Sequence, residues 1–150
     1  MCGISGVLAP VSGGTAQPSR VLAAAMAATL SHRGPDASAT WVDPSGRMAL
    51  GHTRLAIVDV SDAGAQPMTS RDGRWTITYN GEVYNTDDLR GSLGSVAWRG
   101  HSDTEVLVEH ISRHGVVATL KANKGMFAFA CWDAHESELW LARDRFGEKP

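Results

Sequence analysis

Two pairs of short apolar segments, one in the first third of the chain and one at its end, are each joined by a tight link. The first pair is Ser38–Val42 and Met48–Thr53 around Asp43-Pro44-Ser45-Gly46, and the second is Met126–Trp132 and Glu138–Arg143 around Ala134-His135-Glu136-Ser137. Asp43-Pro44-Ser45-Gly46 is a good β-turn sequence, and both pairs are predicted to be hairpins. Strands come first, then helices, then strands again, without strict βαβ alternation. This order predicts an α+β protein with antiparallel sheet.

Two further strands are expected. Cys2–Ala9 is a short apolar segment in which Gly3 and Gly6 allow close approach of a neighbouring backbone. Trp75–Tyr79 alternates apolar and polar residues and continues into Asn80-Gly81. The intervening stretch Arg54–Pro67 carries no periodic pattern and is expected to be irregular.

Helices are predicted in four places: from about Ser19 to Ser31, over Thr86–Leu93, from Ser102 to about His114, and over Val116–Leu120. In the first, Leu22, Met26 and Leu30 recur four residues apart and are expected to form the buried face. Asn85 is placed to cap the second helix. Ser102-Asp103-Thr104-Glu105 is a capping-box pattern for the third, and Gly115 is its expected end.

The bulk composition argues against several classes of protein. The chain has 150 residues, 43% hydrophobic and 20% charged, which suits one globular domain. A net charge of −2 gives no basic field for nucleic acid or an anionic membrane. No membrane span and no signal-peptide pattern are present, and two cysteines make no disulfide framework. A reducing compartment, the cytoplasm, is therefore expected.

Cys2 is informative because of its position. An initiator Met is readily removed before a small residue, which would leave the thiol and a free α-amino group on one residue. The neutral amine would serve as general base and the thiolate as nucleophile. A cysteine at this position taken alone is more often a small buried hydrophobe.

Asn80-Gly81 has two interpretations. The Asn-Gly dipeptide is the strongest short signal for a hairpin turn. Alternatively, the Asn80 amide and the Gly81 backbone N–H point at one developing oxyanion, and the glycine lets a substrate approach the backbone.

Arg54 and Asp103 form a complementary pair of charges. Arg54 is either a surface cation or a planar fork for an α-carboxylate. Asp103 either complements the dipole of its own helix or binds a substrate ammonium group. Taken together, the two would recognise a free amino acid.

The histidines do not recur at metal-ligand spacing, so no metal site is expected. Cys131 lies in an apolar segment and is expected to be part of the core.

These residues resemble the class II (N-terminal nucleophile) glutamine amidotransferases of the asparagine synthetase type. The matching blocks follow the family's order over nearly the whole chain: Cys2–Gly6, His32–Asp36, Gly51–Asp59, Gln66–Met68, Asn80–Asn85, Ser102–Val106, Gly125–Ala130 with Trp132-Asp133, Arg143–Gly147 and Lys149-Pro150. The glutaminase domains of glucosamine-phosphate synthase and of the purine-pathway amidotransferase resemble the chain less closely. β-Lactam synthetase-like relatives tend to lack the nucleophilic cysteine.

The resemblance implies the N-terminal nucleophile hydrolase fold, a four-layer αββα sandwich of antiparallel sheets. It implies hydrolysis of L-glutamine to glutamate and ammonia through a thioester on Cys2. Asn80 and Gly81 would form the oxyanion hole, Arg54 would hold the substrate carboxylate, and Asp103 would hold its amino group. Glu82 and the backbone at Ile57 and Val58 would line the pocket.

The resemblance also implies a partner reaction. Residues 1–150 correspond to the glutaminase domain, and the family motif at Pro150 normally runs on into further strands, so the domain is expected to be incomplete at its C-terminal end. Ammonia would pass to a C-terminal synthetase domain or subunit that uses ATP and Mg, whereas the glutaminase step needs no cofactor. Aspartate is the expected acceptor, a sugar or an antibiotic precursor stays open, and a homodimer is compatible with the family. The alternative is a non-catalytic remnant that binds glutamine or a partner protein, or a purely structural domain.

Overall fold

The structure is a computed structural model that describes residues 1–9, 16–57 and 59–150. Its elements are β1 (Gly3–Leu8), α1 (Ala16–Thr29), β2 (Ala37–Val42), β3 (Met48–Arg54), a 3-10 turn (Asp62–Gly64), β4 (Met68–Thr69), β5 (Trp75–Val83), α2 (Thr86–Ser92), α3 (Asp103–His114), α4 (Val116–Ala122), β6 (Gly125–Asp133) and β7 (Glu138–Arg143). Both predicted hairpins are confirmed, as β2–β3 and β6–β7.

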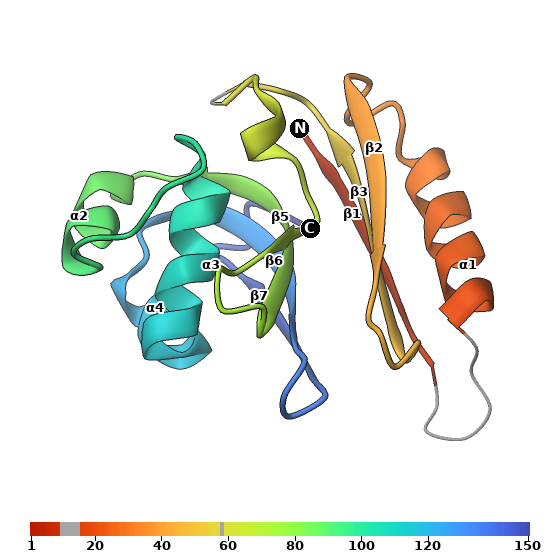
Figure 1. Cartoon of the computed structure of the whole chain (residues 1–150). Coiled ribbons are helices and arrows are strands. Elements are labelled where there is room, and N and C mark those ends of the chain that lie inside the picture. The colour runs from red at the N-terminus through yellow and green to blue at the C-terminus, as the bar shows by residue number, and fades with distance from the viewer. Residues whose placement is uncertain (10–15, 58) are drawn as a thin grey trace.

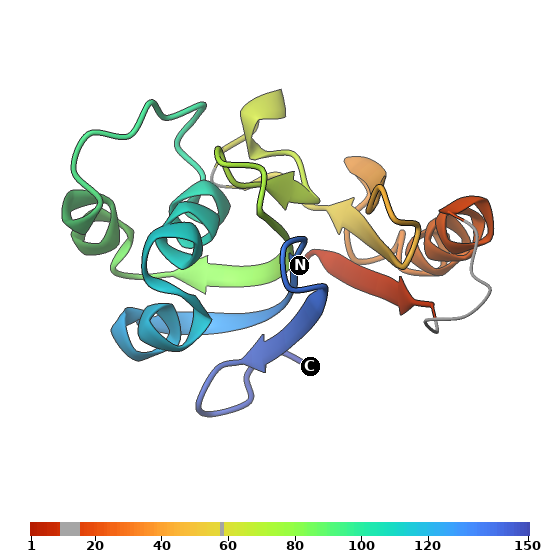
Figure 2. The same ribbon diagram turned by 60° about the horizontal axis from the view of Figure 1, so that its bottom comes forward.

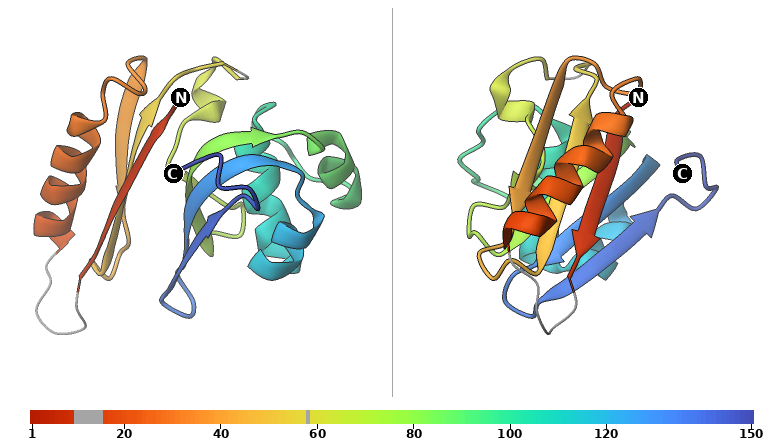
Figure 3. Two further views of the ribbon diagram at one scale, coloured as in Figure 1. Left: turned by 180° about the vertical axis from the view of Figure 1, so that it is seen from behind. Right: turned by 90° about the vertical axis from the view of Figure 1, so that its right-hand side faces the viewer.

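The strands form two antiparallel sheets that pack face to face. Sheet A has the order β1-β3-β2, and sheet B has the order β4-β5-β6-β7. Helix α1 covers the outer face of sheet A, and α2, α3 and α4 lie on the far side of sheet B (Figure 1; Figure 3, left). The four layers are therefore helix, sheet, sheet and helices, which confirms the predicted αββα sandwich of the N-terminal nucleophile hydrolase type.

A small apolar cluster joins the two sheets. Met48 and Leu50 of β3 meet Ala130 and Trp132 of β6, and all four are buried. The indole N–H of Trp132 donates to Asp43 Oδ1 at 3.0 Å, so its one polar group is satisfied. This cluster holds the sheets in contact across the middle of the molecule.

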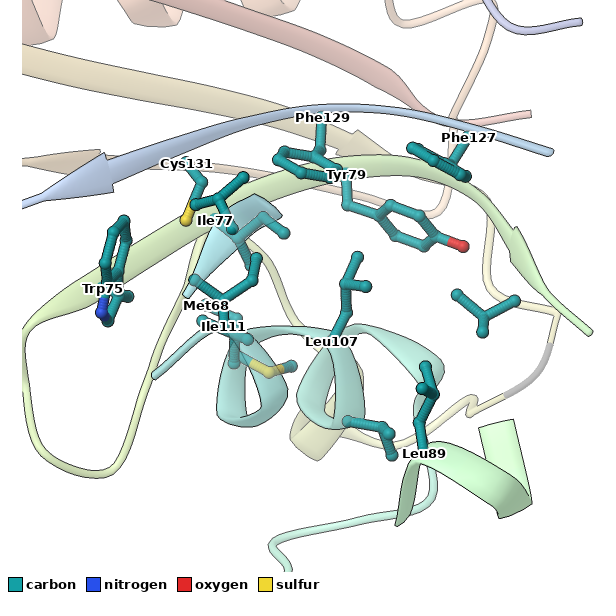
Figure 4. Close-up of a cluster of buried hydrophobic side chains, with 14 residues drawn as sticks. Met68, Trp75, Ile77, Tyr79, Leu89, Leu107, Ile111, Phe127, Phe129 and Cys131 are labelled. Atoms are coloured by element: carbon teal, nitrogen blue, oxygen red, sulfur yellow. The ribbon is translucent and has the colours of Figure 1, made fainter. Parts of the chain in front are cut away.

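The larger core lies between sheet B and the helices (Figure 4). Strand side chains such as Ile77 and Phe129 face Leu107 and Ile111 of α3, and none of the four is more than 2% exposed. Every residue of α3 from Asp103 to Ile111 is buried. Burial of this apolar area is the main stabilising contribution of the α3 layer.

The predicted buried face of α1 is wrong for two of its three residues, whereas the third, Leu30, is half-buried just past the end of the helix. Leu22 and Met26 are 51% and 38% exposed, whereas Ala23 and Ala27 are buried at 0% and 1%. The reason is the close approach of α1 to β3: a Cβ at Gly51 would lie 3.0 Å from the Ala23 carbonyl oxygen and 3.2 Å from the Ala27 Cβ. Only small side chains fit between the two backbones, so the leucine and methionine point outward.

Asn80-Gly81 is not a turn. Strand β5 runs straight through it to Val83, and Gly81 pairs with Phe127 of β6. A Cβ at Gly81 would collide with the Met126 carbonyl oxygen, which explains the glycine by close approach of two strands.

The predicted helix signals are partly confirmed. Ser102 accepts a hydrogen bond from the Glu105 backbone N–H at 3.2 Å, as a capping residue does. Glu105 completes no capping box, because its carboxylate accepts bonds from the backbone N–H groups of Arg99 and Gly100. Asn85 precedes α2 but makes no capping bond, since its side chain bonds to Ala122 and Lys124 instead. That prediction is wrong because a tertiary contact competes for the amide.

Within the described residues, no helix has the length and apolar character needed to cross a membrane.

Candidate active site

A pocket opens where sheet A meets sheet B, next to the N-terminus. Sheet A contributes Cys2 and Arg54, sheet B contributes Asn80 and Gly81, and α3 contributes Asp103. Figure 2 shows the N-terminus at the junction of the two sheets. All five side chains or backbone positions singled out from the sequence therefore line one cavity.

The β1–β3 ladder brings Cys2 and Arg54 together. Gly3 pairs with Thr53, so the preceding Cys2 lies beside Arg54 across the ladder. The Cys2 sulfur accepts a hydrogen bond from the Leu55 backbone N–H at 3.4 Å, and the Cys2 carbonyl oxygen accepts one from Arg33 Nε at 3.2 Å. The thiol is partly exposed and forms no disulfide, as a nucleophile requires.

Asn80 and Gly81 present polar groups to the same cavity. Asn80 is 5% exposed, and its side-chain amide forms no hydrogen bond with any residue that the structure describes. The amide is not among the fully buried, unpaired polar atoms of the described residues, so the pocket leaves it accessible to water or a ligand. The amide is thus available to a substrate oxygen.

Arg54 is already bound by the loop that follows it. Its guanidinium donates to the backbone carbonyl oxygens of Asp59 and of Ser61, the latter at 2.9 Å. Two donors fixed on carbonyls hold the guanidinium plane in one orientation at the edge of the pocket.

Asp103 is held from inside the protein. Its Oδ2 accepts hydrogen bonds from Tyr79 Oη at 2.8 Å and from the Val83 backbone N–H at 3.1 Å. Burial raises the pKa of the Asp103 carboxyl, while these two bonds act in the opposite direction. A cationic group in the pocket would favour the ionised form.

The remaining predicted residues differ in placement. Ile57 and Glu82 line the pocket, although both are exposed. Val58 lies outside the described residues. Asp59, Tyr79 and Lys149 also line the pocket and were not singled out as site residues in the sequence.

Asp59 connects the two charged ends of the pocket. Its Oδ1 accepts bonds from the Ser61 hydroxyl and backbone N–H, and its Oδ2 accepts one from the His101 N–H at 2.9 Å. These bonds, led by the Ser61 hydroxyl, lower the pKa of Asp59 to about 2. Asp59 thereby ties the Arg54 loop to the start of the segment that leads into Asp103. An acidic residue in an irregular stretch carries no sequence signal of such a role.

No group of three or more His, Cys, Asp or Glu side chains suited to a metal lies among the described residues. Cys131 is fully buried, and burial raises the pKa of its thiol. This confirms its prediction as a core residue.

A family model described as a glutamine amidotransferase domain matches residues 1–150. Glutamine-hydrolysing asparagine synthetase 3 of Bacillus subtilis (strain 168) is 46% identical over 132 residues, which are 83% of this chain and 20% of that relative. A glutamine-hydrolysing asparagine synthetase of Sandersonia aurantiaca is 37% identical over 150 residues, covering 100% of this chain and 27% of the relative. Amidase chry2 of Gibberella zeae is 32% identical and covers 99% of this chain and 23% of its own length.

Among solved structures, glutamine phosphoribosylpyrophosphate amidotransferase from B. subtilis superposes with a TM-score of 0.68. It is 23% identical and covers 95% of this chain and 36% of its own. At that identity the likeness supports the fold. The chain spans 20–27% of the length of the three sequence relatives.

Proposed function

The chain belongs to the glutamine amidotransferase domain family, and from that premise we propose that residues 1–150 hydrolyse L-glutamine to glutamate and ammonia. The observation that carries the proposal is the convergence of Cys2, Asn80, Arg54 and Asp103 on one pocket from both sheets and α3. Two relatives that are glutamine-hydrolysing asparagine synthetases support the asparagine synthetase type predicted from the sequence.

Substrate recognition uses both charged ends of the pocket. Arg54 binds the glutamine α-carboxylate, and Asp103 binds the α-ammonium group. The γ-carboxamide then extends toward Cys2, while Ile57 and Glu82 line the surrounding wall. The Asp103 carboxylate binds the ammonium group beside the bonds that it accepts from Tyr79, from Val83 and from the backbone N–H groups at the start of its own helix.

The chemistry begins after Met1 has been removed. The α-amino group of Cys2 accepts the thiol proton, and the thiolate attacks the carbonyl carbon of the γ-carboxamide. The Asn80 amide and the Gly81 N–H stabilise the resulting oxyanion, for which one donor is typically worth about 10²–10³ in rate. The protonated α-amino group of Cys2 then gives its proton to the amide nitrogen, which leaves as ammonia. Water hydrolyses the thioester by the same route and releases glutamate.

The wider reaction is proposed from the relatives. Ammonia passes to an ATP- and Mg-dependent synthetase domain or subunit, with aspartate as acceptor, in the cytoplasm. The glutaminase step requires no cofactor of its own. Because one relative is called an amidase, the acceptor should be tested separately from the hydrolysis.

The decisive experiment measures glutamate release from glutamine by the full-length protein and by two cysteine variants. Cys2→Ala should abolish release, and Cys2→Ser should retain only a small fraction, because a hydroxyl is the poorer nucleophile. Cys131→Ala is the matched control and should keep the wild-type turnover number, since that sulfur is buried in the core. Full activity in Cys2→Ala would falsify the proposal.

Mass spectrometry of the purified protein supplies a second measurement. The proposed mechanism requires that Met1 be absent, because only then does Cys2 carry a free amine. Glutamine binding by calorimetry without turnover, on protein that retains Met1, would favour the non-catalytic alternative.

A further inference from the structure

Lys149 is a buried cation beside the N-terminus. The residue is 5% exposed, lines the same pocket as Cys2, and follows the last strand of sheet B. Figure 1 marks both chain ends between the two sheets, and Lys149 Nζ lies 2.9 Å from Met1 Sδ. The side chain therefore reaches the residue that precedes the proposed nucleophile.

The loop that carries Lys149 is fixed by one carboxylate. Asp144 accepts hydrogen bonds from the backbone N–H groups of Phe127, Phe146, Glu148 and Lys149 at 2.9–3.2 Å. These bonds, led by the one from Glu148, lower the pKa of Asp144 to about 2. Since Phe127 pairs with Gly81, Asp144 ties the lysine to the strands that carry the oxyanion donors.

The partner of Lys149 is weak. A thioether is a poor acceptor for an ammonium group, and no carboxylate among the described residues lies within 4.0 Å of Lys149 Nζ. An ammonium group shielded from water without a counter-charge is unfavourable. When Met1 is removed, Lys149 loses this partner too.

The other charged or titratable groups around Cys2 differ in their partners, and the Nη2 of Arg33 is buried without one among the described residues. Arg33 donates to the Cys2 carbonyl oxygen, Arg54 to the carbonyl oxygens of its loop, and Asp59 accepts from Ser61 and His101. Tyr79 and Asp103 bond to each other, and Glu82 lines the pocket from β5. Lys149 is a cation whose hydrogen-bond partner is Met1, so its surroundings change when Met1 leaves.

We propose that Lys149, after removal of Met1, faces the amino and thiol groups of Cys2 and that its positive charge favours the neutral amine and the thiolate. This inference rests on the proposed function. Repulsion between two nearby ammonium groups favours loss of the proton from one of them, and a positive charge stabilises a thiolate. Lys149 acts as a positioning residue that sets the protonation state in which Cys2 can react.

The test compares Lys149→Met, which removes the charge at similar length, with Lys149→Arg, which keeps it, in the full-length protein. Cys2 alkylation by iodoacetamide is followed against pH without substrate, and kcat/KM for glutamine is measured over the same range. In Lys149→Met the midpoint of alkylation and the acidic limb of kcat/KM should move up by about one pH unit, so alkylation at neutral pH slows about tenfold. Lys149→Arg should stay within about threefold of the wild type.

A second neutral variant tests whether the result for Lys149→Met comes from the lost charge or from altered packing. Lys149→Gln keeps a polar side chain and should shift both profiles in the same direction as Lys149→Met. A uniform loss of kcat with an unchanged midpoint in both neutral variants would show a merely structural role and overturn the inference. That result is distinct from failure of the proposed function, which is decided by Cys2→Ala alone.

Discussion

Helices α1 and α3 cover opposite faces of the sandwich through side chains of very different size. Helix α1 meets sheet A through Ala23 and Ala27, and a view onto this helix shows it lying directly over the strands (Figure 3, right). Helix α3 meets sheet B through larger residues such as Leu107 and Ile111. The α1 layer gains its fit from close backbone approach, whereas the α3 layer gains stability from buried apolar area.

The largest expected effect is in the α3 layer. Leu107→Ala should lower the free energy of unfolding by about 2–5 kcal/mol, because it leaves a cavity in the main core. Chemical denaturation monitored by circular dichroism measures the change. A loss below about 1 kcal/mol would mean that the α3 layer is not the main source of stability.

The second largest effect is expected from acid, which should lower the free energy of unfolding through His52 on the inner face of sheet A. Burial lowers the pKa of His52 on β3 from its usual 6.5 to about 4, and its Nε2 has no partner among the described residues. A histidine with a depressed folded-state pKa contributes stability above pH 6.5 that is lost as the pH falls toward 4. The expected loss between pH 6.5 and pH 5 is about 2 kcal/mol.

The matched variant for this prediction is His52→Gln, which cannot be protonated in that range. Its unfolding free energy should change less between the same two pH values. His110 near α4 also has a pKa lowered by burial, so part of the pH dependence should persist in the variant. An unchanged slope would exclude His52 as the sensitive group.

Enlarging the small face of α1 should have an intermediate effect. Ala27→Leu should cost about 1–3 kcal/mol, because the added atoms must fit between the helix and Gly51. Differential scanning calorimetry detects this as a lower Tm. If stability rose instead, the helix would have to stand further from β3 than the structure shows.

The smallest effect is expected on the outer face of the same helix. Met26→Gln should change the free energy of unfolding by no more than about 0.5 kcal/mol, because the side chain is 38% exposed. Paired with Ala27→Leu, it compares neighbouring positions on opposite faces of α1. A loss as large as that of Ala27→Leu would reverse the assignment of the two faces.

Patterns within a single segment predicted most of the fold. Each hairpin link joins two strands that are adjacent in the sequence, and Ser102 bonds to the backbone N–H of Glu105 only three residues away. In both cases the local sequence contains the two partners of the contact. The spacing of Leu22 and Met26 predicted the wrong buried face of α1, because apolar spacing along a helix does not show how close the neighbouring strand, β3, lies. Gly51, on a different element, decides which face of α1 is buried.

Some residues of the candidate site could likewise be predicted from the sequence, and others could not. Cys2, Arg54, Asn80 and Asp103 were recognisable from residue type and family motifs, and the pocket brings them together. Asp59 and Lys149 were not recognisable as site residues, because their roles depend on His101 and on Met1, far away in the sequence. Contacts of this kind exist only once the chain is folded.

The pocket has one wall on each sheet, so neither sheet carries a complete set of reacting groups. Met48 and Trp132 belong to the buried cluster that joins the sheets, so under the proposed mechanism their packing sets the spacing between Cys2 and the donors at Asn80 and Gly81. Variants that loosen the packing of this cluster are expected to lower the rate of the proposed reaction while leaving the proposed substrate contacts intact. If the proposed mechanism holds, residues of this cluster serve catalysis as well as folding.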